Sequence, residues 1–68
     1  MKNFKKFIKI AESNDFDWEI KRENNEKFYI RLWYRSWHLH CDAFDSLEMT
    51  IAYAIKNMND RIEYEKTL

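Results

Sequence analysis

The chain has 68 residues, with 12 basic and 12 acidic side chains and therefore a formal net charge of zero at pH 7. This length fits one domain, residues 1–68, and the even charge disfavours a dedicated nucleic-acid-binding domain, which usually carries a basic excess. The absence of Gly and Pro excludes Gly-rich phosphate-binding loops. No apolar run approaches the roughly 20 residues of a membrane span, and a single cysteine suits a reducing compartment, so we expect a cytoplasmic protein without a membrane segment.

The first residues predict a helix that ends near residues 13–15. Apolar side chains recur there with helical period, at Phe4, Phe7, Ile8 and Ala11. Four lysines lie largely off that stripe: Lys2, Lys5, Lys6 and Lys9. Asn3 is the expected N-cap. A strand follows, because Phe16, Trp18 and Ile20 alternate with charged residues, and residues 23–26 form the expected turn.

Residues 28–42 predict a two-stranded antiparallel ribbon with a two-residue turn at Arg35 and Ser36. Alternation along each strand then sorts the side chains onto two faces. One face is apolar and belongs to the core: Phe28, Ile30, Leu32, Tyr34, Trp37, Leu39 and Cys41. The other face mixes aromatic and charged residues: Tyr29, Arg31, Trp33, His38, His40 and Asp42. A slip of one residue would exchange the two faces, so the pattern itself favours this register.

The last third of the chain predicts a second helix, with one apolar stripe at Leu47, Ile51, Ala54, Ile55, Met58 and Ile62. Asp45 is the expected N-cap, with Glu48 completing a capping box and with Phe44 and Met49 as a hydrophobic staple. Residues 63–68 are expected to fray. The order α-β-β-β-α predicts an α+β fold: a three-stranded antiparallel meander with both helices packed on one face.

The face of the sheet away from the helices is the candidate contact surface, because Tyr, Trp and Arg are enriched at binding hot spots. The proposed partner-binding residues are Tyr29, Arg31, Trp33, Arg35, His38 and His40. The same residues admit a purely structural interpretation, in which cross-strand pairs hold the sheet together. Trp33 would then stack on His38. Arg31 would pair with Glu19 or Asp17.

No nucleophile, base and oxyanion set can be assembled, so we expect neither enzymatic activity nor a cofactor. His38, His40 and Asp42 share one strand face, a spacing that could present metal ligands. Arg31 should lie beside His40, however, and its fixed charge opposes a divalent cation, so we predict no metal site. Cys41 is expected to point inward, away from both histidines, as a buried structural thiol.

Two charged regions have a functional interpretation as well as a structural one. The lysine face of the first helix could contact phosphate, although such lysines also serve solubility. Asp60, Glu63 and Glu65 are candidate secondary contacts, because they could mimic nucleic-acid phosphates and attract a basic partner.

In length and element order the chain resembles the double-stranded-RNA-binding domain. That family reads the minor groove with a loop containing Gly and Pro, which this chain lacks, and holds phosphates with lysines at the start of its last helix. The last helix here starts Asp45-Ser46-Leu47-Glu48, which would repel phosphate. The resemblance is therefore one of layout and carries none of the binding residues.

The chain also resembles the small inhibitors of bacterial defence encoded by phages and mobile elements, among them the anti-CRISPR proteins. This resemblance rests on the small size, on a net charge that alternates in sign between successive segments of the chain, and on the helix-meander-helix plan. It implies a non-enzymatic, stoichiometric blocker that docks on a larger nucleic-acid-handling protein in the cytoplasm of a bacterial host. The alternative is a small nucleic-acid-binding domain. In it, Tyr29, Trp33 and His38 would stack bases, while Arg31, Arg35 and the lysines of the first helix would contact phosphates. A homodimer that buries the open sheet face against itself is compatible with the first interpretation.

Overall fold

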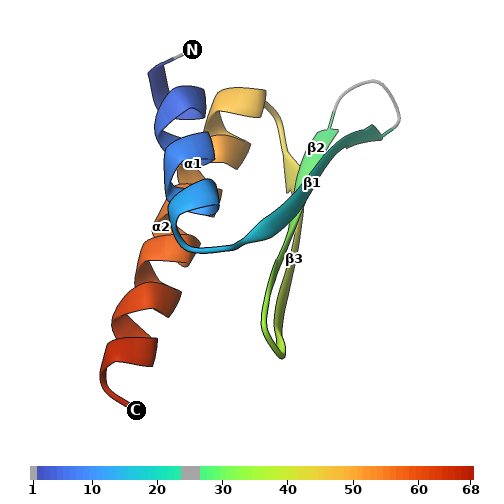
Figure 1. Cartoon of the computed structure of the whole chain (residues 1–68). Coiled ribbons are helices and arrows are strands. Elements are labelled where there is room, and N and C mark those ends of the chain that lie inside the picture. The colour runs from blue at the N-terminus through green and yellow to red at the C-terminus, as the bar shows by residue number, and fades with distance from the viewer. Residues whose placement is uncertain (1, 24–26) are drawn as a thin grey trace.

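The computed structural model describes residues 2–23 and 27–68, and only the backbone of residues 41–43. Its elements follow in the order α1 (Lys2–Ser13), β1 (Asp17–Glu23), β2 (Lys27–Tyr34), β3 (Trp37–Phe44) and α2 (Leu47–Lys66). The strands form one antiparallel sheet in the order β1-β2-β3. Both helices lie on the same side of this sheet (Figure 1). The predicted α+β fold is confirmed.

The hairpin of β2 and β3 has the predicted register from Ile30 to the turn, and the register shifts between Ile30 and Phe28, which lies opposite Phe44. Tyr34 lies opposite Trp37, so Arg35 and Ser36 form the predicted two-residue turn. Because side chains alternate along a strand, this register decides which residues face the helices. The other turn was predicted at residues 23–26 and falls largely outside the described residues, between the end of β1 at Glu23 and the start of β2.

The hairpin turn is made without glycine. Arg35 has a φ of 55°, and Asp15, in the connection between α1 and β1, has a φ of 59°. A left-handed conformation costs a non-glycine residue about 1–2 kcal/mol. The guanidinium of Arg35 lies 5.1 Å from the ring centre of Tyr34, and it donates a hydrogen bond of 3.2 Å to Glu65 of α2. These contacts fix the turn in place and offset part of its cost.

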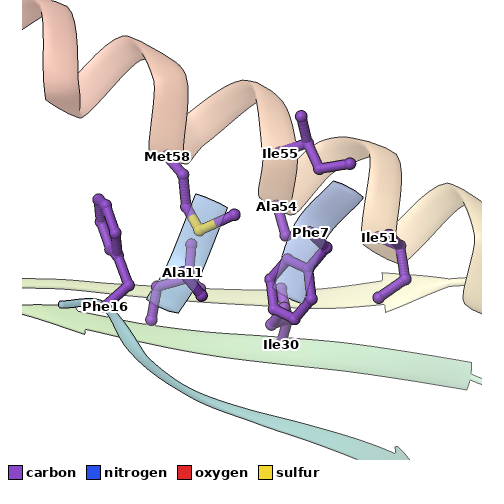
Figure 2. Close-up of a cluster of buried hydrophobic side chains, with 9 residues drawn as sticks. Phe7, Ala11, Phe16, Ile30, Ile51, Ala54, Ile55 and Met58 are labelled. Atoms are coloured by element: carbon purple, nitrogen blue, oxygen red, sulfur yellow. The ribbon is translucent and has the colours of Figure 1, made fainter. Parts of the chain in front are cut away.

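The core lies between the sheet and the two helices. Its buried cluster consists of Phe7, Ala11, Phe16, Ile30, Leu32, Ile51, Ala54, Ile55 and Met58. Figure 2 shows Ala54 and Met58 pointing from α2 toward Phe7 and Ala11 of α1, with Ile30 of β2 beneath. The apolar stripes predicted for both helices are therefore the stripes that pack against the sheet.

One residue predicted for the core lies at its border. Trp18 is 38% exposed, because it belongs to the edge strand β1, which α1 covers only in part. Its ring meets Phe7 edge-on at a centroid distance of 5.1 Å and Phe4 at 6.3 Å. Trp18 therefore closes the side of the core instead of filling its centre.

The start of α2 also differs from the prediction. Ser46 is the N-cap in place of Asp45, and its Oγ accepts a hydrogen bond of 3.0 Å from the backbone N–H of Met49. Asp45 lies one residue earlier and forms an ion pair with Lys27 of β2. Both residue types cap helices well, so the sequence alone left a choice between neighbours.

Three further local predictions are wrong. Asn3 was predicted as an N-cap but lies inside α1. Phe44 packs its ring against Tyr53 at 5.1 Å, and Met49, its predicted staple partner, is 53% exposed. The tail predicted to fray remains helical through Lys66. These differences leave the layer order unchanged.

Truncation of a fully buried ring should cost far more stability than truncation at the edge of the core. Phe7→Ala is expected to lower the free energy of unfolding by about 3–5 kcal/mol, because a cavity replaces the buried ring. Trp18→Ala should cost less, because its ring is already partly in water. Urea unfolding followed by circular dichroism measures both, with the exposed Leu68→Ala as a control within about 0.5 kcal/mol of wild type. A larger loss for Trp18→Ala would contradict this account of the core.

The two candidate N-cap residues of α2 are expected to contribute differently to the free energy of unfolding. Ser46→Ala is expected to cost about 1 kcal/mol, because the N–H of Met49 loses its acceptor. Asp45→Ala removes only a solvent-exposed ion pair and should cost less. Thermal and urea unfolding of both variants give the ranking, and the reverse order would restore Asp45 as the cap.

Candidate functional site: the open face of the sheet

The open face carries cross-strand rows of side chains. Three rows follow from the register: Asp17, Trp33 and His38; Glu19, Arg31 and His40; Lys21 and Tyr29. The register thus brings together five of the six residues predicted to bind a partner, all except Arg35, which lies at the hairpin turn. The register therefore places these side chains beside one another on adjacent strands.

Trp33 and His38 form the most ordered pair on this face. They lie opposite each other on β2 and β3, and their rings stack with a centroid distance of 5.4 Å and an interplanar angle of 10°. Trp33 is half-buried and His38 is exposed. Because the two rings stack, each restricts the orientation of the other.

Tyr29 occupies the centre of a second cluster and is itself covered. Its ring stacks on His40 at 5.1 Å, and the guanidinium of Arg31 lies 5.8 Å from the ring centre. Only 5% of Tyr29 is exposed. In this structure Tyr29 supports its neighbours from below, so the exposed contacts of the cluster come from Arg31 and His40.

Arg31 links this cluster to the edge strand. Its Nη1 lies 3.8 Å from a carboxylate oxygen of Glu19 on β1, the pairing expected under the structural interpretation. Its Nε is buried and has no hydrogen-bond partner among the described residues. The side chain is 39% exposed, so one part of the guanidinium is held by the protein while another part reaches solvent.

Arg35 belongs to a different cluster, at the tip of the hairpin. It shares the carboxylate of Glu65 with Arg61, each at 3.2 Å. The guanidinium of Arg61 also lies 5.7 Å from the ring centre of Trp37 and 4.7 Å from that of Tyr64. This cluster ties the hairpin tip to the last turns of α2, so Arg35 has a structural role that the alternation pattern did not indicate.

The acidic residues proposed as secondary contacts are paired within the molecule. Asp60 bonds with Lys56 at 3.2 Å, and Glu63 bonds with Lys66 at 3.4 Å. Glu65 is the acid between the two arginines and has 15% of its side chain exposed. Because each charge has a local counter-ion, these carboxylates form no strong negative patch.

Across residues 2–23 and 27–68 there is no pocket, and no group of three His, Cys, Asp or Glu side chains is placed to hold a metal ion. His38 and His40 stack on aromatic rings, whereas the side chains of Cys41 and Asp42, named in the metal and thiol predictions, lie outside the described part. Neither described helix is long and apolar enough to cross a membrane.

Comparison with known proteins gives no match: no protein-family model fits the chain, and no curated protein or solved structure is significantly similar to it. The function must be argued from the surface of the molecule.

Sequence reasoning missed Arg61, which joins the hairpin tip to α2. Its spacing of three from Tyr64 and four from Glu65 is the helical spacing at which side chains meet, so a local signal was present. Its contact with Trp37, 24 positions away, has no local signal because it depends on how α2 crosses the sheet.

The stack of Trp33 on His38 should contribute measurably to stability. A double-mutant cycle with Trp33→Ala and His38→Ala is expected to give a coupling energy of about 0.5–1 kcal/mol, the range for cross-strand aromatic pairs. Trp33→Ala with Tyr64→Ala is the control cycle, and its effects should add to within about 0.5 kcal/mol. Equal coupling in both cycles would mean that the stack contributes nothing specific.

Proposed function

We propose that this chain is a non-enzymatic interaction module that docks on a larger protein through the open face of its sheet. The observation that carries the proposal is the ordered set formed by Trp33, His38 and Arg31, with Tyr29 beneath it. Residues of these types dominate the free energy of protein interfaces when they sit near the centre of a contact. The central contacts we propose are Trp33, His38, Arg31 and His40.

Pre-organisation supports this proposal. Immobilising a flexible side chain at an interface costs about 0.5–1.5 kcal/mol. Trp33 and His38 already restrict each other by stacking, and Arg31 is held by Glu19 and Tyr29. A partner that covered this face would therefore lose little side-chain entropy, and the large rings would supply apolar area.

The charge of the open face favours a protein over a nucleic acid as the partner. Its described residues include two acids, Asp17 and Glu19, and two bases, Lys21 and Arg31. Nucleic-acid binding needs an excess of positive charge that neutralises phosphates. Here the one arginine is already beside a carboxylate, so stacking of bases on Trp33 would lack electrostatic support.

We further propose that the partner is a protein that handles nucleic acid in the cytoplasm of a bacterial host and that docking blocks it. Size and the α-β-β-β-α layout support this part, through the resemblance to anti-CRISPR proteins. A blocker of this kind needs no catalytic residues, because occupying a surface is sufficient for inhibition.

Replacement of the half-buried Trp33 tests the docking face. In affinity capture from a lysate of the organism that encodes the chain, Trp33→Ala is expected to lose a protein that wild type retains. With that protein purified, calorimetry should show a dissociation constant at least about thirtyfold larger for Trp33→Ala, since a hot-spot truncation costs about 2 kcal/mol or more. Circular dichroism should show that the variant remains folded.

Tyr64→Ala is the matched control, because it also truncates a half-exposed aromatic ring but on α2, away from the open face. It should bind the partner as wild type does. Equal binding by Trp33→Ala and wild type would refute docking through this face. Sedimentation velocity on the free protein tests the homodimer: a dimer that Trp33→Ala dissociates would make a second copy the occupant instead.

A further inference from the structure

The exposed side of α1 carries a stripe of positive charge. The stripe consists of Lys2, Lys5, Lys6 and Lys9, all exposed, with Lys5 and Lys6 each three or four residues from both Lys2 and Lys9. Within the described part of the chain none of these lysines forms an ion pair. In contrast, ion pairs are formed by Lys27, Arg31, Arg35, Lys56, Arg61 and Lys66.

This arrangement works against the stability of the helix. Like charges three and four positions apart repel each other on a helix surface. Cations near a helix N-terminus also oppose the helix dipole, and the first turn of α1 contains no acid. Sites where a sequence breaks several local rules at once are often sites of function. This unfavourable arrangement therefore indicates that the lysines bind a partner.

The net charge of zero conceals this imbalance. α1 contains four lysines and one acid, Glu12, so it has a formal charge of +3, and the rest of the chain has −3. The even composition, which disfavoured a nucleic-acid-binding domain, thus results from two opposed regions. A partner that approaches α1 meets a local excess of positive charge.

We propose that the lysine stripe of α1 binds the phosphodiester backbone of a nucleic acid. Lys2 and Lys9 are about 10.5 Å apart along the helix axis at 1.5 Å per residue. That length spans about three intervals of 3.4 Å, the axial rise per phosphate of one strand, and so covers about four phosphates. Flexible ammonium side chains suit such a contact, since they bind phosphate as point charges without a fixed geometry.

A membrane surface fits α1 less well. An interfacial helix inserts apolar side chains beside its charged face. In α1 the apolar stripe is already used, because Phe7 and Ala11 are buried and Phe4, Ile8 and Ile10 pack against the core. The exposed side keeps charge without apolar residues for insertion.

This contact is separate from the proposed docking face. α1 lies on the helical side of the sheet (Figure 1). Trp33 follows the core residue Leu32 in β2, so its side chain faces the other side. One molecule could therefore contact a protein with its sheet and a nucleic acid with α1. The inference rests on the lysines of α1 and does not require the proposed function to be correct.

Salt dependence tests the inference with the full chain. Binding to a fluorescein-labelled DNA duplex of about 20 base pairs, followed by fluorescence anisotropy, should weaken about a hundredfold between 50 and 200 mM salt, as expected for about four phosphate contacts. Lys5→Gln, Lys6→Gln and Lys9→Gln together should reduce this loss to about fourfold. The same measurement with single-stranded RNA of the same length, as a second arm, shows whether the lysine stripe binds the phosphates of duplex DNA or of RNA.

The matched control makes the same change of net charge elsewhere: Lys21→Gln, Lys56→Gln and Lys66→Gln. It should keep the salt dependence of wild type, and so should Lys5→Arg, Lys6→Arg and Lys9→Arg together, which retains the charge of α1. The inference is overturned if neither nucleic acid binds at about 50 mM salt, if both glutamine triples lose binding equally, or if only vesicles containing phosphatidylserine bind. Trp33→Ala should bind the duplex as wild type does, and its failure to do so would move the contact to the open face.

Discussion

The alternation of side chains along the β2–β3 hairpin is the constraint on which both sides of the sheet depend. Leu32 and Trp33 are neighbours in the chain, yet Leu32 is fully buried beneath the helices and Trp33 stacks with His38 on the open face. A shift of one residue in the pairing would exchange these roles. The turn that prevents the shift lacks glycine, and Arg35 is held there by Tyr34 and by Glu65 of α2. Contacts outside the hairpin therefore help to secure its register.

The surface of this small domain divides into regions with different electrostatic character. The open face is balanced, because Arg31 lies beside Glu19 and aromatic rings cover each other. The outer side of α2 is also balanced, through ion pairs one helical turn apart. In contrast, α1 keeps an excess of positive charge, with four lysines and one acid. A neutral aromatic face suits a protein partner, whereas a concentrated cationic stripe suits phosphate, and the two lie on opposite sides of the sheet.

The spacing of apolar residues predicted how the helices and the sheet are layered, because an element that buries one face carries apolar residues at regular intervals. This spacing predicted the apolar stripes of α1 and α2 and the two faces of the hairpin. Features set by a choice between similar neighbours could not be predicted: Ser46 and Asp45 are both good caps, and only the backbone geometry selects Ser46. The burial of Tyr29 depends on cover from His40 and Arg31, and the partial exposure of Trp18 depends on how far α1 extends over an edge strand. Such effects arise from three-dimensional neighbours that no local pattern encodes.

The position of α2 after the sheet in the chain has a consequence for biosynthesis. Four of the nine residues in the buried cluster, Ile51, Ala54, Ile55 and Met58, come from α2. The hairpin leaves the ribosome before this helix does, so its apolar side has only α1 to shield it during that interval. Transiently uncovered strands of this kind are prone to misassembly. A newly made chain is therefore most exposed to misassembly in the interval between synthesis of the hairpin and synthesis of α2.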